Sequence, residues 1–202
     1  GQIPLVKTEQ KLLPTFTKQQ VLQLLNQQPN RHTFVGSRDY TIMMVLLETG
    51  IRIQELVSLQ MDGLLFGESE LRIQNGKGRK ARRVPIQKTC ANALKSYVRE
   101  RGELPTKALF VTLDNQPLKM RTVQENIKKY GEAVGLSGVR VSPHTFRHSM
   151  AKFYLLNGGD AFTLQQILGH RCLDMVKLYI NLFCSDIQEQ HRKYSPVENI
   201  KI

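Results

Sequence analysis

The 202-residue chain is predicted to fold as a mainly α-helical domain with a small antiparallel β-sheet, an α+β fold. Most of its apolar residues recur at helical spacing between residues that begin or end helices. Strand-like alternation is confined to short stretches, two of which flank the sequence NGKG at 75–78. The hydrophobic content of 41% is enough for one good-sized core, so one folded domain is expected.

Residues 1–14 contain two prolines and show no helical period, which is typical of a linker. Thr17 and Gln20 then match the capping-box pattern that begins many helices. The apolar face of this first helix is expected to consist of Val21, Leu22, Leu24 and Leu25. The folded part of the chain is therefore expected to begin at about residue 15.

Ser37 is expected to cap a second helix, because apolar residues recur after it at helical spacing. Gly50 is a natural end for that helix, since glycine adopts the left-handed conformation common at helix C-termini. A third helix is expected over 52–59. The alternating stretches 71–74 and 83–86 predict the two strands of a basic β-hairpin.

Helical patterns continue at 89–101 and 121–134, followed by the terminators Gly102 and Gly135, and the apolar run 108–111 favours a short strand between them.

Ser142 and Pro143 predict a well-defined helix start, with the serine as cap and the proline at the first helical position. This helix is expected to end near residue 156. Further helices are expected over 163–168, over 174–181 and, as a polar tail helix, from about 185.

The charge of the chain points to an anionic partner. Lys and Arg number 29 against 17 acidic residues, so the net charge is +12 and the sequence pI is about 9.8. Nucleic acid is the leading candidate, and a surplus of charge that serves only solubility is the alternative.

The three cysteines, Cys90, Cys172 and Cys184, are too scattered for a disulfide scaffold or a zinc site with paired ligands. They favour a reducing compartment. The longest apolar run is far shorter than the roughly 20 residues that span a bilayer. A cytoplasmic protein without membrane segments is therefore expected, and the cysteine pattern predicts no metal site.

The sequence TGIRIQEL at 49–56 places Arg52 just after a helix break and Glu55 three residues later on the same helical face. An ordinary surface ion pair is one interpretation. The other is an arginine that is presented to a phosphate and held in place by its glutamate.

The sequence GKGRKARR at 76–83 gathers five cationic residues on the predicted hairpin. It lacks the order of a Walker loop. A solvated basic hairpin is the simpler interpretation, but Lys77 at the tip could reach a reactive phosphate as a proton donor.

The sequence HTFRH at 144–148 places His144 and Arg147 one turn apart at a helix N-terminus, where backbone amides already favour an anion. Near the C-terminus, Tyr179 follows the sequence LGH at 168–170 by nine residues. Taken singly, Tyr179 is no more distinctive than the other five tyrosines, which can all be packing residues.

Together these motifs resemble the tyrosine recombinase, or phage integrase, family. The family signatures read approximately TGxRxxEL, GKGxKxRxVPL, HxxRH and LGH, with the nucleophilic tyrosine nine residues after the last histidine. Here they read TGIRIQEL, GKGRKARRVPI, HTFRH, ILGH and Tyr179, across most of the chain. The resemblance implies a tyrosine recombinase catalytic-domain fold and a DNA breaking-rejoining enzyme.

The resemblance also implies a role for each matching residue. Arg52 and Arg147 would clamp the non-bridging oxygens of the scissile phosphate. Tyr179 would be the nucleophile, with His144 as the acceptor of its proton.

Lys77 would protonate the departing 5′ oxygen, and His170 would hydrogen-bond the phosphate. Glu55 would support the pocket without reacting. The hairpin cations expected to bind DNA are Arg79, Lys80, Arg82 and Arg83.

The family resemblance extends to organisation and partners. Residues 1–14 would be the linker from a missing N-terminal core-binding domain, 15–184 the catalytic domain, and 185–202 a tail that docks on a neighbouring protomer. The expected partners are double-stranded DNA and three further copies in a tetramer. Neither ATP nor a metal nor another cofactor is implied, because the covalent phosphotyrosine conserves the bond energy.

The lysine and arginine excess favours an integrase or transposase of a mobile genetic element, and four alternatives to it remain. The first is an Xer-type chromosome-dimer resolvase. A type IB topoisomerase shares the tyrosine chemistry. A non-catalytic DNA-binding protein would be expected to have lost a catalytic position, and an RNA-binding module would need an aromatic stacking platform.

Overall fold

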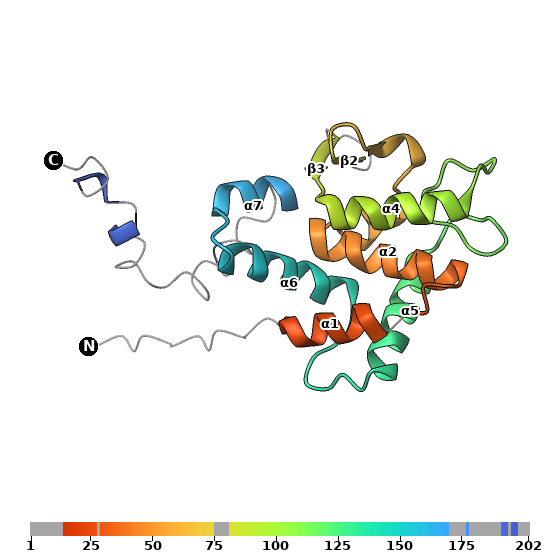
Figure 1. Ribbon diagram of the computed structural model, residues 1–202, viewed down its shortest axis with the longest axis horizontal. Coiled ribbons are helices and arrows are strands. Elements are labelled where there is room, and N and C mark those ends of the chain that lie inside the picture. The colour runs from red at the N-terminus through yellow and green to blue at the C-terminus, as the bar shows by residue number, and fades with distance from the viewer. Residues whose placement is uncertain are drawn as a thin grey trace, which may run out of the picture.

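The computed structural model describes residues 14–27, 29–74, 81–169, 177, 191–193 and 195–197. Its helices and strands are shown in Figure 1. In chain order they are α1 (Lys18–Gln27), α2 (Phe34–Thr49), α3 (Ile53–Val57), the 3₁₀ turn η1 (Met61–Gly63), β1 (Leu64–Leu65), β2 (Glu70–Ile73), β3 (Arg82–Pro85), α4 (Lys88–Arg101), α5 (Met120–Ala133), α6 (Pro143–Leu156) and α7 (Ala161–Leu168). The predicted α+β class is confirmed.

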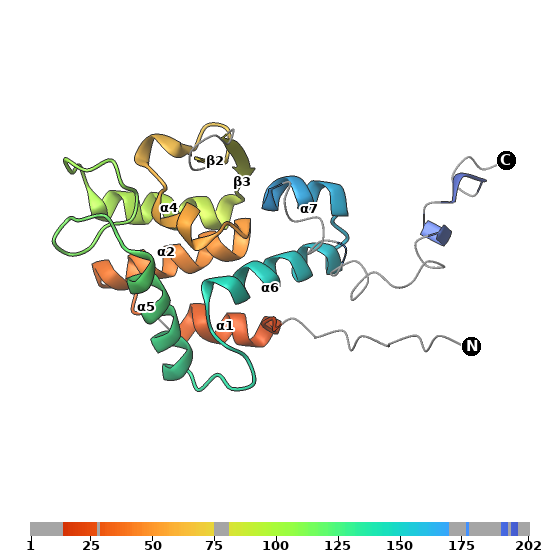
Figure 2. The ribbon, with the colours of Figure 1, turned by 180° about the vertical axis from the view of Figure 1, so that it is seen from behind.

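The long helix α2 forms the centre of the fold. It packs against α4 on one side and α6 on the other, and α5 contacts both α2 and α3. Figure 2 shows the same arrangement from behind, with α6 lying between α1 and α7. Because α2 is covered from several directions, Ile42, Met43 and Leu46 on it are almost completely buried in the main core.

The small sheet has the order β1-β2-β3, with both pairs antiparallel. Leu71 pairs with Val84 and Ile73 pairs with Arg82, which confirms the predicted hairpin; its tip at 75–80 lies outside the described residues. The strand predicted at 108–111 is wrong. This segment makes only isolated bridges, because its partners Gln60 and Pro117 are not parts of strands.

Two of the predicted helix starts are confirmed and one is wrong. Thr17 and Gln20 exchange the two hydrogen bonds of a capping box, and Ser142 accepts from the backbone of Thr145. The prediction of Ser37 as a cap is wrong. Thr33 caps α2 instead by accepting from Gly36, so Ser37 lies inside the helix and is buried.

The first helix differs from the prediction at one residue of its apolar face. Val21 and Leu24 are buried as expected, whereas Leu22 is 58% exposed because it lies on the other side of the helix. The preceding residue Phe16 is fully buried. Its backbone donates to Ser149 on α6, and its ring meets Phe146 edge-on at 5.0 Å.

A buried polar cluster fixes α5 against α2. The side chains of Arg38 and Asp39 are 4% and 3% exposed and form an ion pair at 2.8 Å. Asp39 also accepts from Asn126 and from Tyr130 of α5, each at 2.8 Å. Arg38 donates to the carbonyl of Val111. The cluster satisfies its buried charges internally, so it sets the position of α5 without leaving an unpaired ion.

Among the described residues, no helix is both long and apolar enough to cross a membrane. The helices predicted over 174–181 and from 185 fall mostly outside the described residues, as does the linker predicted over 1–14.

Candidate active site

Helix α6 carries two of the predicted site residues on its first turns. Ser142 caps the helix and Pro143 occupies its first position, so His144 and Arg147 follow at fixed places on its first two turns. Arg147 is 3% exposed. Its guanidinium donates to the carbonyls of Gly50 and, at 3.0 Å, Leu168. Arg147 is therefore held in one orientation by two segments distant in sequence.

The Gly50 turn brings Arg52 to the same place. Gly50 ends α2 in the left-handed conformation, with φ of 59°, and donates to Leu46. A Cβ atom at this position would lie 2.7 Å from Leu168 Cδ2. The turn makes Arg52 the N-cap residue of α3, and the side chain of Arg52 stays 43% exposed. Its guanidinium is thus directed towards solvent at a helix start.

Glu55 organises the surroundings of Arg52. It accepts from the Arg52 backbone at 2.8 Å, and its other oxygen lies 3.5 Å from the Arg52 guanidinium. Arg82 on β3 donates to both Glu55 oxygens, at 2.7 and 3.0 Å. Burial by itself would raise the pKa of Glu55, but the hydrogen bonds and charges of Arg82 and Arg52 outweigh it and lower that pKa. Glu55 is consequently a carboxylate at neutral pH.

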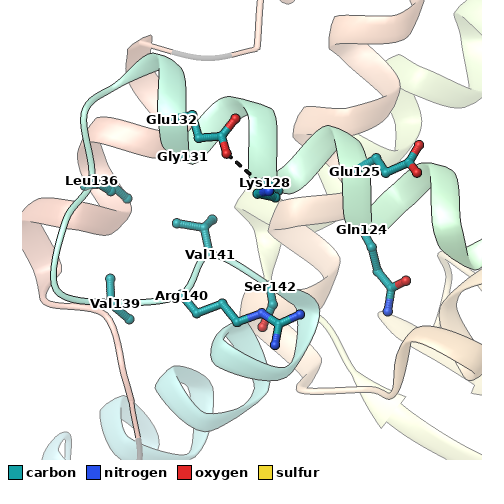
Figure 3. Close-up of a pocket in the computed structure, with 10 residues that line it drawn as sticks. All are labelled: Gln124, Glu125, Lys128, Gly131, Glu132, Leu136, Val139, Arg140, Val141 and Ser142. Atoms are coloured by element: carbon teal, nitrogen blue, oxygen red, sulfur yellow. Dashed lines mark ion pairs between the residues drawn. The ribbon is translucent and has the colours of Figure 1, made fainter.

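Arg52, His144 and Arg147 line one cavity of about 770 Å³. Gln124 and Arg140 also line it, from α5 and from the loop before α6. A second cavity of about 520 Å³ lies next to it and shares these two residues and Ser142. Figure 3 shows this second cavity, where Arg140 and Ser142 lie in the loop that leads into α6 and the Lys128–Glu132 ion pair lies on α5.

Two histidines on α6 are both held in the neutral form. Burial, together with the charges of Arg147 and Arg52, lowers the pKa of His144. Burial and the charges of His144 and Arg147 lower the pKa of His148 to about 4. Their rings meet edge-on with centroids 4.4 Å apart. A neutral imidazole beside two arginines can accept a proton, which is what a general base requires.

The structure brings four of the predicted site residues together, namely Arg52, Glu55, His144 and Arg147. Lys77, Arg79, Lys80, His170 and Tyr179 lie outside the described residues. Among the described residues, no cluster of three or more metal-ligating side chains occurs.

The two remaining hairpin arginines differ from each other. Arg83 is 60% exposed and pairs with Glu68 and Glu70 on the surface. Arg82 was expected to contact DNA, but its side chain is only 14% exposed and three of its nitrogens donate to Glu55 and to the carbonyl of Ile167. The alternation of the strand explains the difference, since neighbouring residues face opposite sides of a sheet.

Sequence reasoning missed three residues at the site. His148 follows His144 by four residues, so the helical period could have placed the two rings together. Gln124 and Arg140 come from other elements, and their sequence surroundings carry no signal that links them to the cavity.

Comparisons with known proteins identify the family of the chain. The model of the phage integrase family matches residues 14–185. The chain is 32% identical over 197 residues to tyrosine recombinase XerD of Staphylococcus haemolyticus, covering 94% of this chain and 65% of the relative. It is 30% identical over 194 residues to tyrosine recombinase XerA of Pyrococcus furiosus, again covering 94% and 65%. The chain spans less than two thirds of the length of these curated relatives.

Solved structures show the same fold. The crystal structure of XerA recombinase superposes with a TM-score of 0.77 and 29% identity, covering 92% of this chain and 66% of that one. A crystal structure of XerH site-specific recombinase, bound to palindromic difH substrate, has a TM-score of 0.74 and 22% identity over 95% and 56% of the two chains. The predicted tyrosine recombinase catalytic-domain fold is thereby confirmed. With its family match over residues 14–185 and this shared fold, the chain belongs to the phage integrase family of tyrosine recombinases.

Proposed function

We propose that this chain cuts and rejoins double-stranded DNA at specific sites through a covalent 3′-phosphotyrosine at Tyr179. The observation that carries the proposal is the cavity in which Arg52, Arg147 and a neutral His144 meet at the start of α6. Two fixed cations and a proton acceptor around one space suit a phosphodiester that is attacked by a hydroxyl group.

The two arginines would hold the scissile phosphate. A guanidinium donates two parallel hydrogen bonds to phosphate oxygens and stays charged at all working pH values. The pentacoordinate transition state carries more negative charge on its non-bridging oxygens than the ground state does. Fixed positive charge from Arg52 and Arg147 therefore stabilises the transition state more than the bound substrate.

The bonds and protons balance as follows. The Tyr179 oxygen forms a bond to phosphorus while the bond from phosphorus to the 5′ oxygen breaks. The tyrosine hydroxyl, with an ordinary pKa of about 10, gives its proton to His144. Lys77 supplies a proton to the departing 5′ oxygen, and His170 hydrogen-bonds the phosphate. The phosphotyrosine bond conserves the energy of the broken phosphodiester bond, so rejoining can reverse each transfer.

The proposed partners follow from charge and family. A net charge of +12 favours a polyanion such as duplex DNA. Arg83 is exposed on β3 and is the described hairpin residue best placed to contact a DNA backbone, while Arg79 and Lys80 are proposed to do so from the tip. We also propose that four protomers assemble on two duplexes and that the tail 185–202 docks on a neighbouring protomer.

The biological role within the recombinases is proposed to be Xer-type resolution. The sequence alone favoured a mobile-element integrase because of its basic character, but the curated relatives described above carry Xer names. The Tn1549 transposon integrase shares the fold with a TM-score of 0.70 at 20% identity, which supports no role beyond the fold. Deletion between two directly repeated cognate sites, in preference to integration into a target lacking one, would support the Xer role.

The central test traps the covalent intermediate. A duplex nicked close to the cleavage position releases a short fragment after cleavage, so rejoining is prevented and an SDS-resistant adduct accumulates. We expect Tyr179→Phe to abolish the adduct while DNA binding persists. The matched control is Tyr40→Phe, because Tyr40 on α2 stacks with Arg31 through its ring and needs no hydroxyl for that contact. An adduct that persists in Tyr179→Phe would exclude Tyr179 as the nucleophile.

A further inference from the structure

The C-terminal end of α7 is held by two arginines from other elements. The last carbonyls of a helix have no partner within the helix, and cationic side chains are favoured beside them. Arg82 Nε donates to the carbonyl of Ile167 at 3.2 Å, and Arg147 Nη2 donates to the carbonyl of Leu168 at 3.0 Å. Two consecutive carbonyls at the end of α7 are thus bound by β3 and by α6.

The same two arginines also hold the segment that carries Arg52. Arg147 donates to the carbonyl of Gly50, at the turn before Arg52. Arg82 donates to both oxygens of Glu55, and Glu55 in turn accepts from the Arg52 backbone. Arg82 therefore lies at the junction of three segments: β3, the α3 start and the end of α7.

We propose that Arg82 is a positioning residue of the recombinase site, which fastens Glu55 and the end of α7 to β3 and thereby orients Arg52 without touching DNA. This inference rests on the proposed function. It replaces the expectation that Arg82 binds the DNA backbone.

Burial and geometry separate Arg82 from a DNA-contacting residue. Its side chain is 14% exposed and the Glu55 side chain is 10% exposed, so their two hydrogen bonds are shielded from water. A bidentate pair of this kind fixes the orientation of both partners. The guanidinium also lies against Gly169, where a Cβ atom would approach Arg82 Cζ to 3.8 Å. Adjacent Arg83, by contrast, is 60% exposed.

Removal of Arg82 would change the chemistry of Glu55. The charged groups that act on the Glu55 carboxylate are Arg82 from β3 and Arg52 at the start of its own helix. Without Arg82, burial continues to favour the protonated acid, and a protonated Glu55 is a poorer acceptor for the Arg52 backbone. The cleavage defect of an Arg82 variant should therefore deepen as the pH falls, whereas a purely structural role would not produce that trend.

The test measures DNA affinity and cleavage rate separately. Arg82→Gln, Arg82→Lys, Glu55→Gln and the control Arg83→Gln are made in the full chain. The dissociation constant for the cognate duplex is measured over a range of salt concentrations. The rate of adduct formation is measured on the nicked duplex at saturating protein, between pH 6 and pH 8.

We expect Arg82→Gln to leave DNA affinity unchanged and to slow cleavage by about 10- to 100-fold, because small misplacements of catalytic groups cost this much. Its effect should not add to that of Glu55→Gln, since both remove the same link. Arg82→Lys should recover part of the rate by restoring a charge beside Glu55. Arg83→Gln, at a proposed DNA contact, should weaken binding and reduce its salt dependence.

Three outcomes would overturn the inference. One is an Arg82→Gln variant that cleaves at the parental rate at saturating protein, but whose slope of log affinity against log salt concentration falls by about one phosphate contact. That result would make Arg82 a DNA contact. Another is full additivity with Glu55→Gln. If Arg82→Gln fails to fold, Arg82→Lys decides, and a parental rate and pH profile in that variant would contradict the inference.

A readout that needs no chemistry separates this inference from the proposed function. The Arg52 amide donates to Glu55, so its hydrogen exchange reports the orientation of that carboxylate. We expect Arg82→Lys to speed this exchange relative to Arg83→Lys. If the parental chain forms no adduct but this difference is seen, the proposed function fails and the positioning role stands. If the exchange is unchanged, the positioning role fails whatever the parental activity.

Discussion

Arg147 Nη2 lies 3.0 Å from the carbonyl oxygen of Leu168, which joins the first turns of α6 to the last turn of α7. The same guanidinium binds the Gly50 carbonyl at the end of α2. Three helices therefore depend on one buried arginine that also lines the candidate active site. A substitution of Arg147 should therefore affect the stability of the fold as well as the proposed cleavage.

Arg147→Lys should cost both stability and cleavage. Lysine keeps the positive charge, but its ammonium group lacks the planar fork of N–H donors with which Arg147 binds two carbonyls and would bind a phosphate. We expect a lower thermal midpoint and adduct formation slowed by about 100-fold or more. Calorimetry and the nicked-duplex assay measure the two effects. Arg83→Lys is the matched control on the exposed strand surface, and an Arg147→Lys rate within about twofold of the parent would contradict the prediction.

Gly50→Ala should destabilise the fold more than Gly135→Ala does. Both glycines end helices with positive φ, 59° and 66°, so both substitutions carry the cost of a left-handed alanine, about 1 kcal/mol. Only Gly50 is crowded, because its Cβ would lie 2.7 Å from Leu168 Cδ2 and 3.2 Å from Met150 Sδ, whereas nothing lies within 4 Å at Gly135.

The difference between these two free energies of unfolding isolates the close approach of α2 to α7. We expect Gly50→Ala to lose about 1–3 kcal/mol more than Gly135→Ala in urea denaturation. Equal losses would mean that Leu168 and Met150 can move aside without cost.

His148 should make the fold less stable in mild acid. Its pKa falls from an ordinary 6.5 to about 4 in the folded state. Between these values the unfolded chain binds a proton that the folded chain does not, so stability falls as the pH drops from 6.5 towards 4 and is fully present above 6.5.

A shift of this size corresponds to a loss on the order of 3 kcal/mol across that window. Urea denaturation at pH 7 and at pH 4.5 measures the loss. His148→Asn should remove the part of this pH dependence of the unfolding free energy that comes from the imidazole. An unchanged slope in His148→Asn would assign the acid sensitivity to other groups.

His144 should titrate below an ordinary histidine. Burial and the nearby Arg147 and Arg52 charges disfavour its protonated form, so its base form persists to lower pH. An NMR titration of its ring proton should give a midpoint below 6.5, and Arg52→Gln should move that midpoint upwards by removing one cation. A midpoint at or above 6.5 in the parental chain would argue against His144 as a base that is ready at neutral pH.

Tyr130→Phe should loosen α5 without changing the site residues. The Tyr130 hydroxyl donates to buried Asp39 at 2.8 Å, and the lost hydrogen bond leaves a carboxylate oxygen less well satisfied. We expect a loss of about 1–2 kcal/mol in unfolding free energy. Tyr40→Phe, whose ring contact with Arg31 survives the change, should cost much less. Equal costs would contradict a special role for the Asp39 cluster.

Local patterns in the sequence determined most elements and the family. The capping box at Thr17, the left-handed stop at Gly50 and the Ser142–Pro143 start each depend on neighbours a few residues away, and the structure has all three. The helical spacing of His144 and Arg147 is local too. For the same reason the catalytic signatures could be identified from residue order alone.

Contacts between distant segments decided the rest. Ser37 became a buried interior residue because Thr33 and Gly36 start α2 one turn earlier, and the apolar run at 108–111 paired with segments that are not strands. Arg82 and Arg83 are adjacent cations in the sequence. They differ in burial and in partners only because the sheet and the end of α7 enclose Arg82 and leave Arg83 exposed. Burial, partners and charge fields arise between segments that lie tens of residues apart, so no local pattern can encode which arginine meets Glu55 and which meets solvent.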